Sequence, residues 1–105
     1  AGADAIMIHS RDRSPKKVYE FCKIYKKLKI DKPLVAVPSS YSQVKEQELI
    51  KNGVNLVIYA NHLLRSIYPN MIYTAKSILK NKRAKESEKR LMSIKEILNL
   101  IPGTN

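Results

Sequence analysis

The chain has no tryptophan, one phenylalanine, one cysteine and three glycines among its 105 residues. The single Cys22 excludes a disulfide within the chain and is typical of a reducing, cytoplasmic setting. So few glycines exclude a glycine-rich phosphate loop. No apolar run approaches the roughly 20 residues of a membrane-spanning helix, and no signal peptide is visible. We therefore expect a cytoplasmic protein that has no membrane partner.

Acidic residues are also scarce, with 9 Asp and Glu against 20 Lys and Arg, for a net charge of +11. Such a balance favours anionic partners, among them nucleic acid and phosphorylated metabolites. Most of the lysines alternate with apolar residues at helical spacing, which favours solvated outer helix faces over a nucleic-acid interface. A basic α/β module that binds nucleic acid remains an alternative, and it requires lysines clustered on one face and a steep salt dependence.

Hydrophobic residues make up 44% of the chain, enough for a packed core. Three apolar segments, 5–8, 33–38 and 54–60, are separated by segments of helical pattern. The first has no polar alternation, which is typical of a strand buried on both faces in a parallel sheet. Helices between strands predict an α/β fold with right-handed crossovers and parallel strands. The first and third segments also repeat one pattern, a glycine, a spacer, and then Asp4 or Asn55.

Capping signals predict where the helices begin. The first helix is expected from Pro15, after the N-cap Ser14, to near Lys29. The second is expected over 43–52, after Ser42 as its N-cap. These two helices connect the three strands in sequence.

The remainder of the chain is expected to be helical at both of its ends. A helix starting near Asn61 contains Pro69, which predicts a kink or break near residues 67–68. Residues 80–90 are charged, have no apolar stripe and are expected to form a mobile connector. Ser93 and Glu96 then form a capping box for a short helix. Its narrow apolar seam must dock on the rest of the protein or on a partner, since so short a helix is marginal alone.

Candidate chemistry is limited to a few polar side chains. His9 and Ser10 directly follow the first strand, where α/β enzymes place their reactive groups, although a histidine that only caps a loop fits equally well. His62 follows an N-cap position and is interpreted as structural. Asp12 alone forms neither a magnesium site nor an acid–base pair, and no Cys/His set has zinc spacing. The chain can therefore contribute to a phosphate-binding pocket but not complete one.

Three ordered motifs together resemble the phosphoenolpyruvate mutase family of the isocitrate lyase superfamily. They are GADAIMIHS at 2–10, PLVAVPSSY at 33–41 and GVNLVIYANHLLR at 53–65. The resemblance covers nearly the whole chain. Two mild departures are Ser39, where threonine is expected, and Arg11, where lysine is common.

The resemblance implies a (β/α)8 TIM-type barrel, of which this chain would be the C-terminal three βα units, with parallel strands six to eight, and a C-terminal helix. Residues 1–81 would belong to the barrel, and 82–105 would be the charged connector and docking helix. The implied enzyme is an isomerase, an intramolecular phosphotransferase of phosphonate biosynthesis. It interconverts phosphoenolpyruvate and phosphonopyruvate with Mg²⁺, forming a carbon–phosphorus bond. His9 matches the family histidine that contacts the phosphoryl group of the substrate.

The resemblance places no catalytic and no metal-binding residue within this span. The nucleophilic aspartate and the Mg²⁺ ligands would lie upstream of Ala1, so the 105-residue piece alone is expected to be inactive. Phosphonopyruvate hydrolase or a carbon–carbon lyase of the same superfamily remain alternatives, because the loop that discriminates them is absent. A homo-oligomer that exchanges the last barrel helix is implied, and a nucleotidyltransferase domain follows in some members. Gly2 is typical of a residue that ends a preceding helix, so we expect a longer polypeptide.

Overall fold

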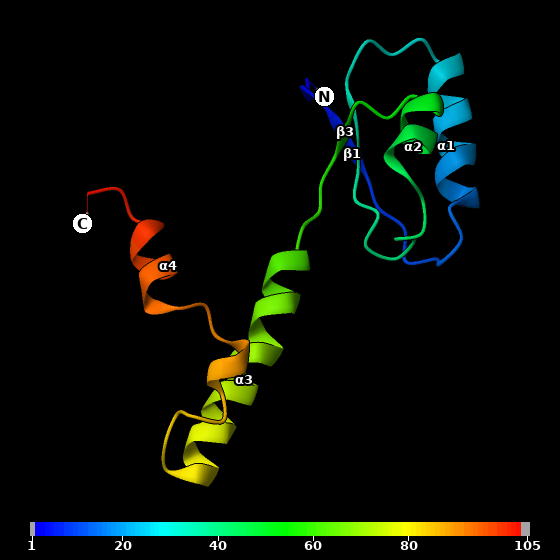
Figure 1. Cartoon of the computed structure of the whole chain (residues 1–105). Helices are drawn as coiled ribbons and strands as arrows, with labels where there is room; N and C mark the ends of the chain where they lie inside the picture. The colour runs from blue at the N-terminus through cyan, green and yellow to red at the C-terminus, as the bar shows by residue number, and fades with distance from the viewer. Residues whose placement is uncertain (1, 104–105) are drawn as a thin grey trace. The chain divides into compact units, whose positions relative to one another are not determined.

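A computed structural model describes residues 2–103 of the chain. Residue 1 and residues 104–105, the outer ends of the two ranges predicted from the sequence, lie outside the described residues. The contacts within the chain divide it into two compact units, Ala1–Ala60 and Asn61–Asn105. Each unit is described by itself below (Figure 1).

The first unit is built on a three-stranded sheet of β1 (Ile6–Ile8), β2 (Leu34–Ala36) and β3 (Leu56–Val57) in the order β1-β2-β3. Both pairings are parallel, with Ile6 opposite Leu34 and Val35 opposite Leu56. The predicted α/β class and the parallel direction of the three strands are therefore confirmed.

Two helices, α1 (Lys16–Lys27) and α2 (Glu46–Lys51), pack against the same side of this sheet (Figure 1). The core between the helices and the sheet consists of buried, mostly apolar side chains contributed by α1, β2, α2 and the segments that follow β2 and α2. These are Val18, Cys22, Tyr25, Leu34, Ala36, Tyr41, Leu49 and Val54. Cys22 is 2% exposed and is therefore a small core residue of α1.

The opposite face of the sheet is not covered by either helix. Met7, Val35 and Leu56 form one cross-strand row, and none of them belongs to the core cluster. Met7 is 63% exposed and Leu56 is 52% exposed, whereas Val35 on the central strand is 8% exposed. The expectation that the first strand is buried on both faces is therefore wrong for the described residues, because α1 and α2 shield only one face.

Both helices of this unit begin later than predicted. The N-cap position of α1 is Pro15, although the hydroxyl of Ser14 accepts a hydrogen bond of 3.4 Å from the amide of Lys16. The prediction that Ser42 caps the second helix is wrong, since α2 begins at Glu46 after Lys45. The side chain of Gln43 instead donates a 2.7 Å hydrogen bond to the carbonyl of Arg13. This contact between distant segments holds Gln43 outside the helix.

The second unit begins with α3 (His62–Asn81), a single helix that contains Pro69. The predicted interruption near residues 67–68 does not divide it. Proline removes only one backbone donor. The hydroxyl of Ser66 donates to the carbonyl of Leu63 at 2.7 Å, and the side-chain amide of Asn70 donates to the carbonyl of Ser66 at 2.9 Å.

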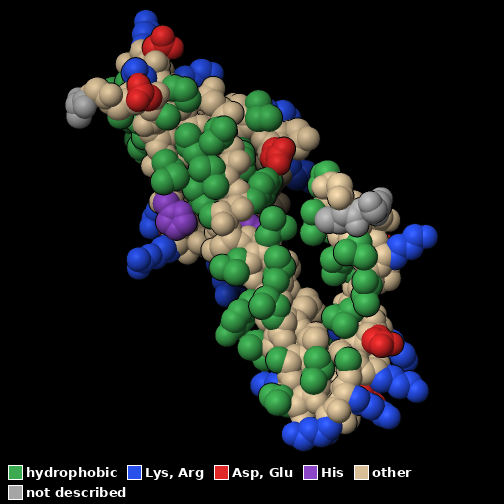
Figure 2. Space-filling model, turned by 90° about the vertical axis from the view of Figure 1, so that its left-hand side faces the viewer, with side chains coloured by type: hydrophobic (Ala, Val, Ile, Leu, Met, Phe, Trp, Pro, Cys, Tyr) green, Lys and Arg blue, Asp and Glu red, His purple; other side chains and the backbone are tan. Residues whose placement is uncertain are grey.

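None of the side chains of α3 is buried. Figure 2 shows hydrophobic side chains exposed along this part of the chain. Leu63 is 79% exposed, and Met71 is 63% exposed. Among the helices within residues 2–103, none has both the length and the apolar composition required to cross a membrane.

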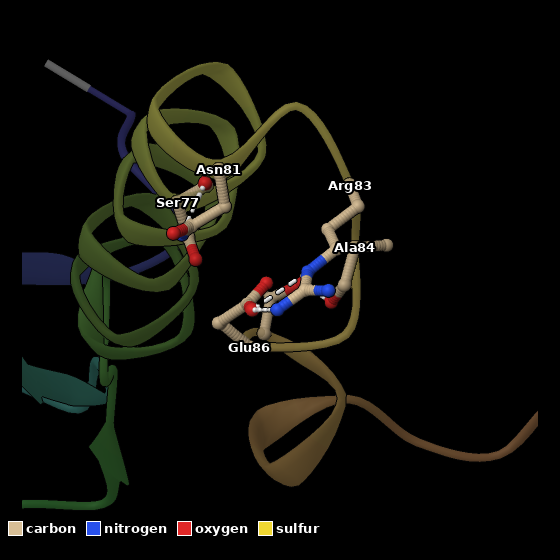
Figure 3. A network of polar contacts seen from close by, with 6 residues as sticks. Ser77, Asn81, Arg83, Ala84 and Glu86 are labelled. Carbon is tan, nitrogen blue, oxygen red and sulfur yellow. Dashed lines mark hydrogen bonds and ion pairs between the residues drawn. The ribbon is translucent and has the colours of Figure 1, made fainter.

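The chain turns sharply after α3 through a network of side-chain contacts (Figure 3). Arg83 forms an ion pair with Glu86 at 2.6 Å, and the buried hydroxyl of Ser87 donates to the carbonyl of Ala84 at 2.7 Å. The 3₁₀ helix η1 (Glu88–Arg90) follows. The segment predicted to be a mobile connector thus forms a hydrogen-bonded turn and a short helix.

The last helix, α4 (Ile94–Asn99), confirms the predicted capping box. The hydroxyl of Ser93 accepts a hydrogen bond from the amide of Glu96 at 3.2 Å, and the carboxylate of Glu96 accepts one from the amide of Ser93 at 2.9 Å. Two donors that the helix itself leaves unpaired are thereby satisfied.

Candidate functional site

His9 lies directly after the carboxyl end of β1 and is exposed. It lines a cavity of about 320 Å³ between this strand end and the first turns of α1. The other lining residues are Ile8, Ser10, Lys17, Val18 and Phe21. The histidine is therefore open to a ligand at the edge of the sheet where parallel α/β folds bind their substrates.

A short polar loop connects this strand end to α1. The hydroxyl of Ser10 accepts a hydrogen bond of 3.1 Å from the amide of Asp12. The carboxylate of Asp12 in turn lies 2.8 Å from the ammonium of Lys17. The hydrogen bond from Lys17 to Asp12 is the main reason that the pKa of Lys17 lies above its ordinary value, and the negative charge of Asp12 is the second reason. The cavity is therefore lined by both the ammonium group of Lys17 and the imidazole ring of His9.

Sequence reasoning missed Lys17 as a site residue. The helical pattern placed it with the other lysines that lie off the apolar stripe of α1, where a solvated face is the expected role. The available signal was Asp12, the one acidic residue just beyond a strand's carboxyl end. The partner of Asp12 is Lys17, in the first turn of the next helix, and no short sequence motif indicates that these two residues form a pair.

The loop after β2 is anchored at the same edge by Tyr41, whose side chain is completely buried at 0% exposure. The preceding Ser39 and Ser40 are half-buried, and the amide of Ser39 donates to the carbonyl of Val37 at 2.9 Å. Among residues 2–103, no group accepts from or donates to the hydroxyl of Tyr41. Burial is the main cause of the raised pKa of Tyr41, and an electrostatic interaction with Cys22 adds to it.

The segment after β3 is tied to α2. The hydroxyl of Tyr59 donates a 2.8 Å hydrogen bond to the carboxylate of Glu46, and this bond is the main cause of the raised pKa of Tyr59. The hydroxyl of Tyr19 binds Glu48 of the same helix at 3.1 Å. Both acidic residues of the first turn of α2 are therefore engaged by tyrosines.

His62, which was interpreted as structural, is the first residue of α3 in the second unit. Asn61 occupies the N-cap position and makes no side-chain capping hydrogen bond. The structure therefore places His62 at a helix start, as predicted, and it does not belong to the cavity lined by His9.

Metal-binding side chains do not gather in the described part of the chain. Within residues 2–103, no three His, Cys, Asp or Glu residues are grouped so that they could hold a metal ion. Asp12 is the acidic residue nearest to His9 along the chain, and its carboxylate forms an ion pair with Lys17.

A family model described as phosphoenolpyruvate phosphomutase matches residues 1–79. The chain belongs to the phosphoenolpyruvate phosphomutase family. The matched residues include all three strands, His9 and Lys17. The resemblance of the three sequence motifs to this family is thereby confirmed.

Individual members of the phosphoenolpyruvate phosphomutase family agree with this assignment. A phosphoenolpyruvate phosphomutase of Tetrahymena pyriformis is 34% identical over 100 residues, which are 95% of this chain and 32% of the relative. The crystal structure of a phosphoenolpyruvate phosphomutase from Streptomyces platensis subsp. rosaceus matches with a TM-score of 0.82 and 32% identity, over 94% of this chain and 33% of that one.

A related hydrolase is equally similar. The crystal structure of a phosphonopyruvate hydrolase in complex with oxalate and Mg²⁺ matches with a TM-score of 0.80 and 35% identity, over 94% of this chain and 34% of that one. The chain thus spans about a third of the length of the relatives that it matches. Identity to a mutase and identity to a hydrolase differ too little to separate these two activities.

Proposed function

We propose that this chain is the C-terminal part of a phosphoenolpyruvate mutase, an isomerase that interconverts phosphoenolpyruvate and phosphonopyruvate. The proposal is supported by the family match over residues 1–79 and by relatives of which the chain covers about a third. The observation that carries it is the exposed His9, which lines a cavity with the ammonium of Lys17 at the carboxyl end of a parallel sheet.

The proposed parent fold is a (β/α)8 barrel in which β1, β2 and β3 are strands six to eight. Residues 1–81 would belong to the barrel, and 82–105 would be the connector and docking helix. The uncovered row of Met7, Val35 and Leu56 supports this arrangement, since a barrel strand has helices on one face and the barrel interior on the other.

In the proposed reaction His9 binds the phosphoryl group of the substrate. An imidazole N–H at a strand end donates a hydrogen bond to an anionic oxygen as negative charge shifts during transfer, and such preorganised donors stabilise the transition state. Lys17 adds positive charge to the same cavity, although its ion pair with Asp12 reduces the net effect. Neither side chain is proposed as the nucleophile.

The proposed cofactor is Mg²⁺, which when bound would neutralise charge on the oxygens of the substrate. The hydrolase relative crystallised with oxalate and Mg²⁺ supports this assignment. As the resemblance to the family implies, the metal ligands and the nucleophilic aspartate are proposed to lie in the part of the enzyme outside this chain; within residues 2–103 no three His, Cys, Asp or Glu residues are grouped for a metal ion. We propose accordingly that the 105-residue chain alone is inactive.

The intact enzyme is proposed to be a cytoplasmic homo-oligomer, in which a nucleotidyltransferase domain can follow this segment.

The test is to follow phosphonopyruvate conversion by the intact protein with ³¹P NMR. A mutase yields phosphoenolpyruvate, whereas a hydrolase yields pyruvate and free phosphate, and the similar identity of the hydrolase relative makes that the second candidate. His9→Ala should lower kcat by about 10²- to 10³-fold, the usual effect of removing one transition-state donor. Ile50→Ala, a change at an exposed position on α2, is the matched control.

The melting temperature of His9→Ala separates a binding role from a structural one. Because His9 is exposed and lies outside the core cluster, the variant should melt at the same temperature as the unchanged protein. A lower melting temperature with full activity would contradict the proposed role of His9. Absence of conversion of phosphonopyruvate to either product would contradict the proposed function itself.

A further inference from the structure

A second cavity, of about 380 Å³, lies at the opposite edge of the sheet from His9. It is formed by the last turns of α1, the segment leading into β2 and the turn between α2 and β3. Three of its lining residues are core side chains, namely Cys22, Tyr25 and Leu34, which are 2%, 9% and 1% exposed. The inner part of the cavity is therefore largely apolar and fixed by core packing.

The outer part of the same cavity is strongly basic. Lys26, Lys29 and Lys32 line it, and all three are exposed, whereas Asp31 is the only acidic residue of the lining. The ion pairs within residues 2–103 are Lys17 with Asp12 and Arg83 with Glu86. None of the three cavity lysines therefore has a carboxylate partner in the described part of the chain.

Lys29 occupies a conformation that disfavours its own side chain. Its φ is +51°, in the left-handed region, directly after the C-cap residue Leu28 of α1. Glycine is the usual residue at this position because an L side chain is strained there. Lys29 thus combines a strained backbone conformation with a place in the lining of the cavity. The lysine at this point contributes a charge that a glycine would not.

The cavity lining is held in place by hydrogen bonds before any ligand binds. The hydroxyl of Tyr25 donates to the carbonyl of Lys32 at 3.0 Å, which fixes the backbone of one cavity lysine against α1. The side-chain oxygen of Asn55 accepts from the amide of Leu34 at 2.9 Å. A preformed lining lowers the cost of ordering groups on binding.

We propose that this cavity binds a small phosphate ester with an apolar or aromatic body. Three ammonium groups without acidic partners attract a phosphate dianion, and the buried residues of the lining accept the apolar body. The volume lies within the range of about 300–1,000 Å³ typical of small-molecule sites. The proposal does not depend on the proposed mutase activity, because the cavity is at the amino ends of β2 and β3 and does not include His9.

The test is a calorimetric titration of the intact protein with 1-naphthyl phosphate and, separately, with inorganic phosphate at low salt. The naphthyl ester should bind more tightly than phosphate, because only the ester carries an apolar body. Its affinity should fall as salt is added, since the lysines are exposed. Equal affinity for the two probes, or no heat of binding for either at millimolar concentration, would overturn the proposal.

Lys29→Gly is the decisive variant, since it removes a charge and relieves strain at once. It should raise the melting temperature and weaken binding of the naphthyl ester by about two- to fivefold, the effect of one exposed charge. Lys82→Gly is the matched control, because Lys82 has a φ of +55° after α3 and does not line this cavity. It should raise the melting temperature and leave the affinity unchanged. An equal loss of affinity in both variants would show attraction to net charge alone and would overturn the proposal.

Discussion

Asn55 is bound to Leu34 through both its side chain and its backbone. Its side-chain oxygen accepts a hydrogen bond from the amide of Leu34 at 2.9 Å, and its own amide donates to the carbonyl of Leu34 at 2.8 Å. Leu34 is 1% exposed, so its amide has no access to water as an alternative partner. The pair joins the start of β3 to the start of β2.

Replacing Asn55 with alanine should lower the free energy of unfolding by about 1–3 kcal/mol, the cost of leaving a buried donor unpaired. Asn55→Asp should lose much less, because a carboxylate oxygen also accepts from the amide of Leu34. Asn52→Ala, which removes an exposed 2.8 Å hydrogen bond to the carbonyl of Glu48, is the control. Urea denaturation of the intact protein measures all three, and similar losses in the Asn55 and Asn52 alanine variants would contradict the argument.

Tyr41→Phe should leave the stability unchanged or raise it by about 1 kcal/mol, since it removes a buried hydroxyl that has no hydrogen-bond partner within residues 2–103. Tyr25→Phe is the matched comparison, because that hydroxyl donates to the carbonyl of Lys32. It should lower the stability by about 1 kcal/mol. Thermal denaturation of both variants checks the contrast. Destabilisation by Tyr41→Phe would show that its hydroxyl is bound by a group outside these residues.

The capping box of α4 should weaken in acid. Hydrogen bonds from the hydroxyl and then the amide of Ser93 lower the pKa of Glu96 from its ordinary value of 4.5. A depressed carboxyl pKa means that the contribution to helix stability is present above pH 4.5 and is lost as the pH falls through the folded value. NMR titration of Glu96, together with the amide shifts of α4, measures both. In Ser93→Ala the pKa of Glu96 should return towards its ordinary value; an unchanged titration would show that the box does not form.

The 105-residue chain expressed alone should self-associate, because Met7 and Leu56 leave an apolar row of the sheet open to water. The double variant Met7→Lys/Leu56→Lys should lower the association constant measured by sedimentation equilibrium. Ile50→Lys on α2 is the control, since Ile50 and Met7 are both 63% exposed but Ile50 lies outside the row. Equal effects of the double variant and the control would assign the association to another surface.

Two parts of the fold that the sequence pattern encodes were predicted correctly, namely the direction of the strands and the cap of the last helix. The parallel direction of the strands follows from apolar segments separated by helices, and the capping box of α4 is specified by Ser93 and Glu96 within four positions. The start of α2 was predicted wrongly, because Gln43 binds the carbonyl of Arg13, 30 residues earlier in the chain. No local pattern reports such a contact.

The candidate site divides in the same way. The position of His9 after a strand was readable, because hydrophobic runs mark strand ends. Two other features could not be predicted. The pairing of Lys17 with Asp12 was missed because a lysine beside an apolar stripe is expected at the surface. The burial of Tyr41 was missed because a tyrosine in a serine-rich loop is also expected there. Their environments are set by how α1 and the loop after β2 pack, which is a property of the tertiary structure.

The bond between Asn55 and Leu34 also bears on how this protein can be engineered. It lies at the amino ends of the strands, as does the left-handed turn at Lys29, whereas His9 lies after a carboxyl end. Substitutions made at the amino ends of the strands therefore leave the cavity of His9 at the other end of the sheet unchanged, so that stability and the lining of that cavity can be varied separately.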